Sequence, residues 1–329
     1  MSSQMERILM ENPARFSLYP IQEHDLFALY KKHVSTFWTA SEIDYSADVT
    51  HFERLDPQEQ HFLKCVLAFF AGSDGIVSEN LLRRFASEVQ LAEARAFYAF
   101  QFAMEQVHSE TYSLLLDAIV RDVEEKKSLV HVHTTLPSVQ NKMLWALEWL
   151  DENIPFAERL IAWACVEGVL FSSSFAAIYW YKRKGILPGL VHSNDLIARD
   201  EALHCEFAAA LYKKLDYPVS PARCHEIMAG AVSAELAFVD EALPFAILGM
   251  NVDEMRTHVQ AVADTVLGLL GYAPLYGGKK SPFEFMDMIS VPGVSNFFER
   301  RVSEYQKNGL EGQSGVFMED EQSMFDGAF

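Results

Sequence analysis

Two copies of a Glu-x-x-His pattern constrain the fold of this chain more than any other feature. Of its 11 histidines, only His108 and His204 follow a glutamate by three residues, namely Glu105 and Glu201. On a helix, residues three apart share a face, so each pair would present a carboxylate and an imidazole together. A two-metal site in a helical bundle takes one such pair from each of two helices and one carboxylate from each of two others. The pattern therefore predicts an all-α fold around a metal pair.

Two further acids complete this set. Asp74 lies 31 residues before Glu105, and Glu167 lies 34 residues before Glu201. The order of a carboxylate followed by Glu-x-x-His thus occurs twice, as expected of two helical hairpins that each supply half a site. Four carboxylates would neutralise two divalent ions, and this oxygen-rich set suits iron or manganese better than zinc or copper.

Each acid also has a structural explanation. A single Glu-x-x-His is commonly a solvated pair, and Asp74, flanked by Gly72 and Gly75, fits the cap of a broken helix. Glu167 is harder to explain, because it interrupts the apolar run 160–181, which contains no Lys or Arg. A buried carboxylate must be paired, neutralised or bound to metal, so Glu167 favours the metal site.

Aromatic residues accompany the predicted site. Tyr112 lies one turn beyond His108 on the same helical face, where a strongly oxidising metal pair could take an electron from it. Phe171 and Phe175 follow Glu167 at i+4 and i+8 on an expected continuous helix, so their rings would keep the pocket dry. An ordinary buried phenol and plain core packing are the alternatives.

Composition and charge exclude several classes of protein. The 329 residues are 50% hydrophobic, which is enough for a large core, and the net charge of −19 disfavours nucleic acid and anionic membranes. The N-terminus lacks the apolar segment of a secretory signal. The run 160–181 is long enough to span a bilayer, but it carries Glu167 and three consecutive serines. We expect a cytoplasmic protein in which this helix is buried.

Periodicity and capping signals predict the remaining elements. Helices are expected at 21–34, 57–85, 88–121, 137–150, from 155 through the apolar run, from Ser193 or Asn194 through His204, and at 221–243 and 253–271. Asp56 is the expected N-cap of the second helix.

His131 and His133 resemble a metal pair on a strand, but without neighbouring acids a turn is the better interpretation. Trp38 lies in a connector, where a tryptophan normally anchors packing.

Five ordered segments give the chain a resemblance to a known family. They are STFWTASEID (35–44), LAFFAGSDGIV (67–77), MEQVHSETY (104–112), VEGVLFSSSF (166–175) and RDEALH (199–204). Together they resemble the small, radical-generating subunit of class I ribonucleotide reductase, of the eukaryotic or viral type, over roughly residues 10–306. The resemblance implies a ferritin-like helical bundle with additional helices, with the dimetal site in the bundle core. It also implies an oxidoreductase subunit of deoxyribonucleotide biosynthesis for DNA replication.

The resemblance assigns a metal site to particular residues. Six residues match the family's dimetal ligands: Asp74, Glu105, His108, Glu167, Glu201 and His204. Glu105 and Glu201 match the bridging carboxylates. The implied cofactor is two iron ions per chain, with manganese as the alternative.

The resemblance also assigns a radical and its route. Tyr112 matches the tyrosine that becomes a stable radical after O2 activation. Its apolar pocket is matched by Phe171, Phe175 and Ile197. Trp38 and Asp200 match the relay that, with His108, starts radical transfer to the large subunit, and Tyr305 matches the tail tyrosine that continues it.

The implied assembly is a homodimer that is active only with the large subunit, which holds the ribonucleoside diphosphate. Three regions are expected: an N-terminal arm (1–20), a ferritin-like helical domain (21–307) and a C-terminal tail (308–329) that docks on the large subunit. The tail is rich in Gly, Ser and acidic residues and ends in Phe329, as in the eukaryotic pattern, although the residues before it differ.

Two other functions fit the same motifs. A stand-alone di-iron oxidase or oxygenase would act on its own small substrate and would not need Trp38 or Tyr305. A non-catalytic paralogue that stabilises an active subunit would usually lack a ligand or the tyrosine, and here Tyr112 and all six matching ligands are present.

Overall fold

The structure is a computed structural model that describes residues 6–130, 136–242 and 250–283. Within these ranges every regular element is a helix and no strand is present, which confirms the all-α prediction. His131, His133, Tyr305 and the predicted tail lie outside the described residues.

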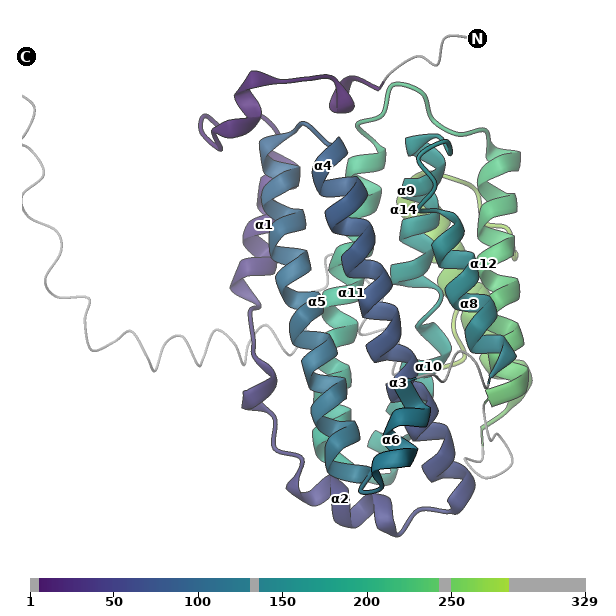
Figure 1. Cartoon of the computed structure of the whole chain (residues 1–329). Coiled ribbons are helices and arrows are strands. Elements are labelled where there is room, and N and C mark those ends of the chain that lie inside the picture. The colour runs from purple at the N-terminus through teal and green to yellow at the C-terminus, as the bar shows by residue number, and fades with distance from the viewer. Residues whose placement is uncertain (1–5, 131–135, 243–249, 284–329) are drawn as a thin grey trace, which may run out of the picture. The chain divides into compact units, whose positions relative to one another are not determined.

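Four helices form the centre of the bundle: α3 (Pro57–Asn80), α5 (Ala92–Ile119), α9 (Phe156–Gly168) and α11 (Pro188–Tyr212). Helix α3 packs on α5, α9 packs on α11, and α5 contacts α11, so the two halves meet. Helix α1 (His24–Ser35) packs on α5 and α11, and Figure 1 shows it alongside α5. This is the arrangement expected of a ferritin-like bundle, with two predicted hairpins facing each other.

Additional helices cover this centre. Helix α12 (Pro221–Ala242) contacts α8 (Pro137–Glu148), α9 and α14 (Val252–Leu270), and Figure 1 shows it beside α8. Helix α14 also contacts α10 (Ser172–Lys184) and α11. The short helices α2 (Ser46–Glu53), α4 (Ala86–Glu88) and α6 (Val123–Val130) connect the longer ones. Residues 89–91 separate α4 from α5, so the helix expected from residue 88 begins four residues later.

Helix α3 begins as predicted and then continues without a break. The Asp56 side chain accepts a hydrogen bond from the backbone N–H of Gln58, and Glu59 bonds back to the Asp56 N–H, which forms a capping box. The helix runs through Asp74, so the interpretation of Asp74 as the cap of a broken helix is wrong. The irregularity lies further on, in the π-helical turn η4 (Leu81–Phe85).

The apolar run 160–181 is two helices and not one. Helix α9 ends at Gly168 and α10 begins at Ser172, whose hydroxyl donates to the Val169 carbonyl at 2.7 Å. By length and composition, the stretches Pro57–Glu88 and Phe156–Lys184 could each cross a membrane, but most of each is buried inside the bundle. They are core helices of the kind that the sequence predicted for the second stretch.

Helix α11 begins five or six residues before the predicted cap, which was Ser193 or Asn194. Its first residue is Pro188, and Ser193 instead donates its hydroxyl to the Leu190 carbonyl within the helix. The buried Asp48 of α2 accepts the backbone N–H groups of Gly189 and Leu190 at 2.9 and 2.8 Å. The cap comes from a distant helix, so no neighbouring residue signals it. A Cβ on Gly189 would lie 2.9 Å from the Asp48 carboxylate, so this approach requires glycine.

A buried ion pair joins α8 to α12. Lys142 Nζ lies 2.7 Å from Glu235 Oε2, and both side chains are at most 1% exposed. Lys142→Met keeps most of the volume but removes the cationic partner of the buried Glu235, so we expect a loss of about 3–5 kcal/mol in the free energy of unfolding. Urea denaturation of the metal-free protein measures this loss.

The exposed pair of Lys127 and Glu124 provides the control, because Lys127→Met should cost less than about 1 kcal/mol. Equal losses in the two variants would contradict the prediction.

Candidate metal centre

The structure brings together all six predicted ligands, each at most 4% exposed. Helix α3 contributes Asp74, α5 contributes Glu105 and His108, α9 contributes Glu167, and α11 contributes Glu201 and His204. They form two groups whose potential ligand atoms lie within 4.8 Å of one another: Glu105, Glu167, Glu201 and His204 in one, and Asp74, Glu105 and His108 in the other. Glu105 belongs to both groups, so the two potential positions for a metal adjoin.

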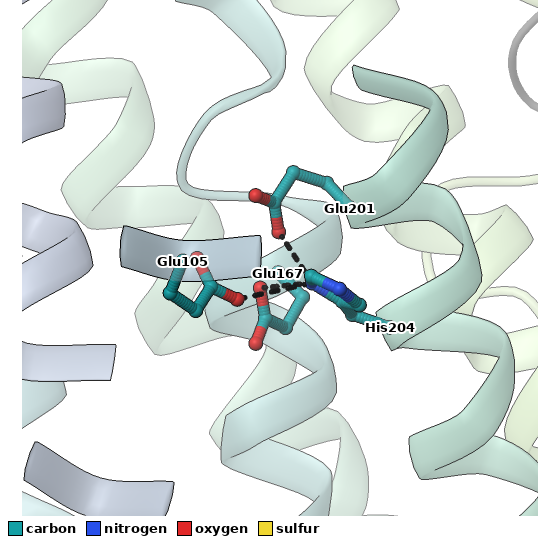
Figure 2. A group of neighbouring side chains, drawn as sticks. All are labelled: Glu105, Glu167, Glu201 and His204. Carbon is teal, nitrogen blue, oxygen red and sulfur yellow. Dashed lines mark hydrogen bonds and ion pairs between the residues drawn. The ribbon is translucent and has the colours of Figure 1, made fainter. Parts of the chain in front are cut away.

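Glu105 and Glu201 lie between the two histidines. His108 Nδ1 is 3.4 Å from Glu105 Oε2 and 3.1 Å from Glu201 Oε1. His204 Nδ1 is 3.1 Å from Glu105 Oε1 and 3.2 Å from Glu201 Oε2. Each carboxylate thus directs one oxygen toward each histidine. Figure 2 shows the carboxylates of Glu105, Glu201 and Glu167 converging on His204.

The donor set fits a pair of divalent cations. Two of its buried oxygens, Asp74 Oδ2 and Glu167 Oε2, have no hydrogen-bond partner among the described residues. Burying such groups without a partner is costly, and cations would satisfy both of them. Carboxylate oxygens with two imidazoles are the ligands of iron and manganese sites.

The protein alone does not balance the charge of this cluster. Burial raises the pKa of Asp74, and the charge of Glu105 raises it further. Burial and the charge of Glu201 likewise raise the pKa of Glu167. Burial would lower the pKa of His204, but Glu201 and Glu105 outweigh it and raise that pKa well above its usual value. The metal-free cluster therefore holds protons, and metal binding would release them.

Trp38 is hydrogen bonded to Asp200, which contacts the ligand His108, so it does more than fill space. Its Nε1 donates to Asp200 Oδ2 at 2.8 Å, and the same oxygen lies 3.2 Å from His108 Nε2. The Trp38 ring is stacked near the His108 ring at 5.9 Å. Burial alone would raise the pKa of Asp200, but the charges of Arg199 and His108 outweigh it and keep that pKa well below its usual range. Asp200 is therefore a buried carboxylate that links Trp38 to His108.

Tyr112 lies in an aromatic pocket. It is 3% exposed, and its ring centroid is 4.8 Å from that of Phe70. The Phe70 ring in turn lies 5.5 Å from Phe171 and 5.3 Å from Phe175, and Ile197 is also buried. Phe171 and Phe175 thus lie beside Phe70, which packs on Tyr112, and neither lies on the helix that carries Glu167. Burial raises the pKa of Tyr112, and the Asp74 charge adds to this, so the phenol keeps its proton.

The sequence interpretation missed four residues that contact the site. Gln101 donates its amide to Glu167 at 2.9 Å, and its position four residues before Glu105 could have indicated the shared helical face. Arg199 bonds Asp200 at 3.1 Å and directly precedes it in the sequence. Phe70 lies four residues before Asp74, so the same spacing could have indicated it. His33 carried no such signal, because its contact with His204 joins distant segments.

Comparisons with known proteins agree with this geometry. Residues 15–282 match the family described as ribonucleotide reductase, small chain. The chain is 52% identical to the ribonucleoside-diphosphate reductase small chain of Nicotiana tabacum over 302 residues, which cover 92% of each chain. It is 50% identical to that of Spisula solidissima over 310 residues, which cover 94% of this chain and 80% of the relative.

A solved structure extends the likeness to the fold. The ribonucleotide reductase Rnr4 homodimer from Saccharomyces cerevisiae aligns with a TM-score of 0.80 at 33% identity, and the alignment covers 92% of this chain and 93% of that one. The resemblance drawn from five short segments is therefore confirmed over most of the chain. The buried carboxylates and histidines of this chain match the dimetal-carboxylate character of the family. The chain belongs to the ribonucleotide reductase small-chain family.

Proposed function

We propose that this chain forms a stable radical on Tyr112 and passes it to a large subunit, which reduces ribonucleoside diphosphates to deoxyribonucleotides. The observation that carries the proposal is the buried contact chain from Trp38 through Asp200 to His108. A stand-alone oxidase has no use for such a connection between its metal site and a loop. A non-catalytic paralogue has no use for an intact set of buried ligands beside a buried tyrosine.

The six buried ligands would hold two divalent ions, with Glu105 and Glu201 as bridges. The bridging role is supported by the position of each carboxylate between His108 and His204. Gln101 orients Glu167 through its amide N–H. Iron is the proposed metal and manganese the alternative, since both accept hard oxygen ligands. When bound, the metal pair would activate O2 and so supply the oxidant for Tyr112.

The protein around Tyr112 would protect the radical. Phe70 packs on the phenol ring, Phe171 and Phe175 pack on Phe70, and Tyr112 has almost no contact with solvent.

The proposed route out of the site begins at His108 and Asp200. Trp38 donates its indole N–H to Asp200, which can accept that proton when the ring is oxidised. Tyr305, outside the described residues, is proposed to continue the route to the large subunit. The same proposal includes a homodimer, a docking tail at 308–329 following a helical domain at 21–307 and an arm at 1–20, and a cytoplasmic location.

Trp38→Phe tests the route. The change keeps an aromatic ring but removes the N–H donor, and loss of a hydrogen bond to a charged group costs about 1.5–3 kcal/mol. If this cost falls on the transfer step, turnover with the large subunit should fall about tenfold to a hundredfold. The measurement is the rate of deoxyribonucleotide formation at saturating large subunit.

Trp163→Phe is the matched control. Trp163 is equally buried at 3% exposed, and its Nε1 has no hydrogen-bond partner among the described residues. Its replacement should leave turnover close to that of the parent. Equal turnover in both variants would show that the Trp38 hydrogen bond has no part in transfer.

A further inference from the structure

Each of the two ligand histidines turns Nδ1 toward the ligand carboxylates and Nε2 away from them. The two Nε2 atoms have different partners. His108 Nε2 lies 3.2 Å from Asp200 Oδ2, which is an anionic acceptor. His204 Nε2 lies 3.3 Å from Nε2 of His33, a residue of α1 that is 1% exposed. In both contacts, Nε2 of a site histidine meets a buried polar group from another helix. The partners differ in charge, because one is a carboxylate and the other an imidazole.

The direction of the hydrogen bond to His33 follows from the position of the His204 ring. Its Nδ1 faces three carboxylates, Glu105, Glu201 and Glu167, at 3.1, 3.2 and 3.8 Å. A metal bound among these oxygens takes Nδ1 without its proton, so Nε2 of His204 carries the hydrogen. His204 then donates, and Nε2 of His33 accepts.

Packing alone does not account for a histidine at position 33. Its ring lies among aromatic neighbours, 5.2 Å from Phe97 and 4.8 Å from Phe100. An apolar side chain would fill this space without a polar cost. Instead, His33 Nδ1 is buried and has no hydrogen-bond partner among the described residues. Such a group costs about 1–3 kcal/mol, so the contact with His204 is the feature that distinguishes His33 from a phenylalanine.

We propose that His33 is a positioning residue that fixes the tautomer and orientation of His204 and makes the two metal positions unequal. An acceptor behind a metal-binding histidine orients the ring and raises its basicity. The Asp200 carboxylate does this more strongly for His108 than a neutral imidazole does for His204. The position served by His204 should therefore bind its cation less tightly. This inference rests on the proposed dimetal site. It adds a positioning residue and an order of affinity for the two metal positions.

Titration of the metal-free protein with Mn(II) tests the proposal. Free Mn(II) is read by electron paramagnetic resonance (EPR), so the measurement gives the number of ions bound per chain and their affinities without any activity assay. The parent should bind two ions with unequal affinity. His33→Phe should weaken the weaker position by about tenfold to a hundredfold and leave the other unchanged. His33→Gln should stay near the parent, because its amide reaches the place of the ring Nε2 and can accept the same hydrogen bond.

A second buried histidine provides the matched control. His258 on α14 is 0% exposed, its Nδ1 lies 2.8 Å from Ser281 Oγ, and its ring is 5.4 Å from Phe283. His258→Phe makes the same change away from the site and should leave both affinities unchanged. If the His33→Phe variant does not fold, as judged by circular dichroism, His33→Leu replaces it in the comparison with His33→Gln.

The possible outcomes separate this inference from the proposed function. Loss at one position in His33→Phe, with recovery in His33→Gln, supports the positioning role. Equal losses at both positions, no loss, or equal behaviour of the His33→Gln and His33→Phe variants would overturn it. A parent protein that fails to bind two ions would instead contradict the dimetal site itself.

Discussion

Tyr112→Phe is expected to abolish ribonucleotide reduction while leaving two metal ions bound per chain. The change removes one oxygen, and no described metal ligand depends on it, because Tyr112 makes no hydrogen bond with the six ligand side chains. Phenylalanine cannot be oxidised to a stable radical in the way a phenol can, so turnover should fall to background. Turnover with the large subunit and metal content measure the two parts of the result.

Tyr98→Phe on the same helix is the control. Tyr98 is 1% exposed, and its hydroxyl has no hydrogen-bond partner among the described residues, so the substitution is equivalent in burial and chemistry. Turnover should stay near that of the parent. Activity near the parent level in Tyr112→Phe would refute the radical assignment, and loss of metal in that variant would show that Tyr112 supports the site structurally.

Removal of residues 308–329 is expected to abolish turnover with the large subunit without changing the radical. The proposed radical site lies in the helical domain, far in sequence from the segment removed, whereas docking is assigned to that segment. The measurements are turnover at increasing concentrations of the large subunit and the radical content of the truncated chain. A synthetic peptide of residues 308–329 should inhibit the full-length protein, and a scrambled peptide should not.

Unchanged turnover after this truncation would refute the tail as the docking element. Turnover that recovers at high concentrations of the large subunit would show that the tail adds affinity and that other surfaces also dock. Loss of the radical together with turnover would contradict the division into a helical domain and a separate tail.

The metal centre could be predicted from sequence because its information is local. Glu105 and His108 share a helical face by spacing alone, as do Glu201 and His204. The buried charge of Glu167 in an apolar run required a partner, and the structure provides one in the cluster. The start of α3 at Pro57 could likewise be predicted from neighbouring residues, because they form a capping box.

The features that sequence could not give depend on contacts between distant segments. Trp38 meets Asp200 across 162 positions, and His33 meets His204 across 171. The start of α11 was misplaced because its cap, Asp48, lies on another helix. The break between α9 and α10 was missed because apolar residues continue through it, and hydrophobicity alone does not mark a helix end there.

The central claim is that this chain makes a tyrosyl radical at Tyr112. The most direct test loads the metal-free protein with Fe(II), exposes it to O2 and records low-temperature EPR spectra, with Tyr112→Phe and Tyr98→Phe prepared in parallel. We predict a tyrosyl signal in the parent and in Tyr98→Phe and none in Tyr112→Phe. Two irons bound per chain without a radical in the parent, or a tyrosyl signal that persists in Tyr112→Phe, would contradict it.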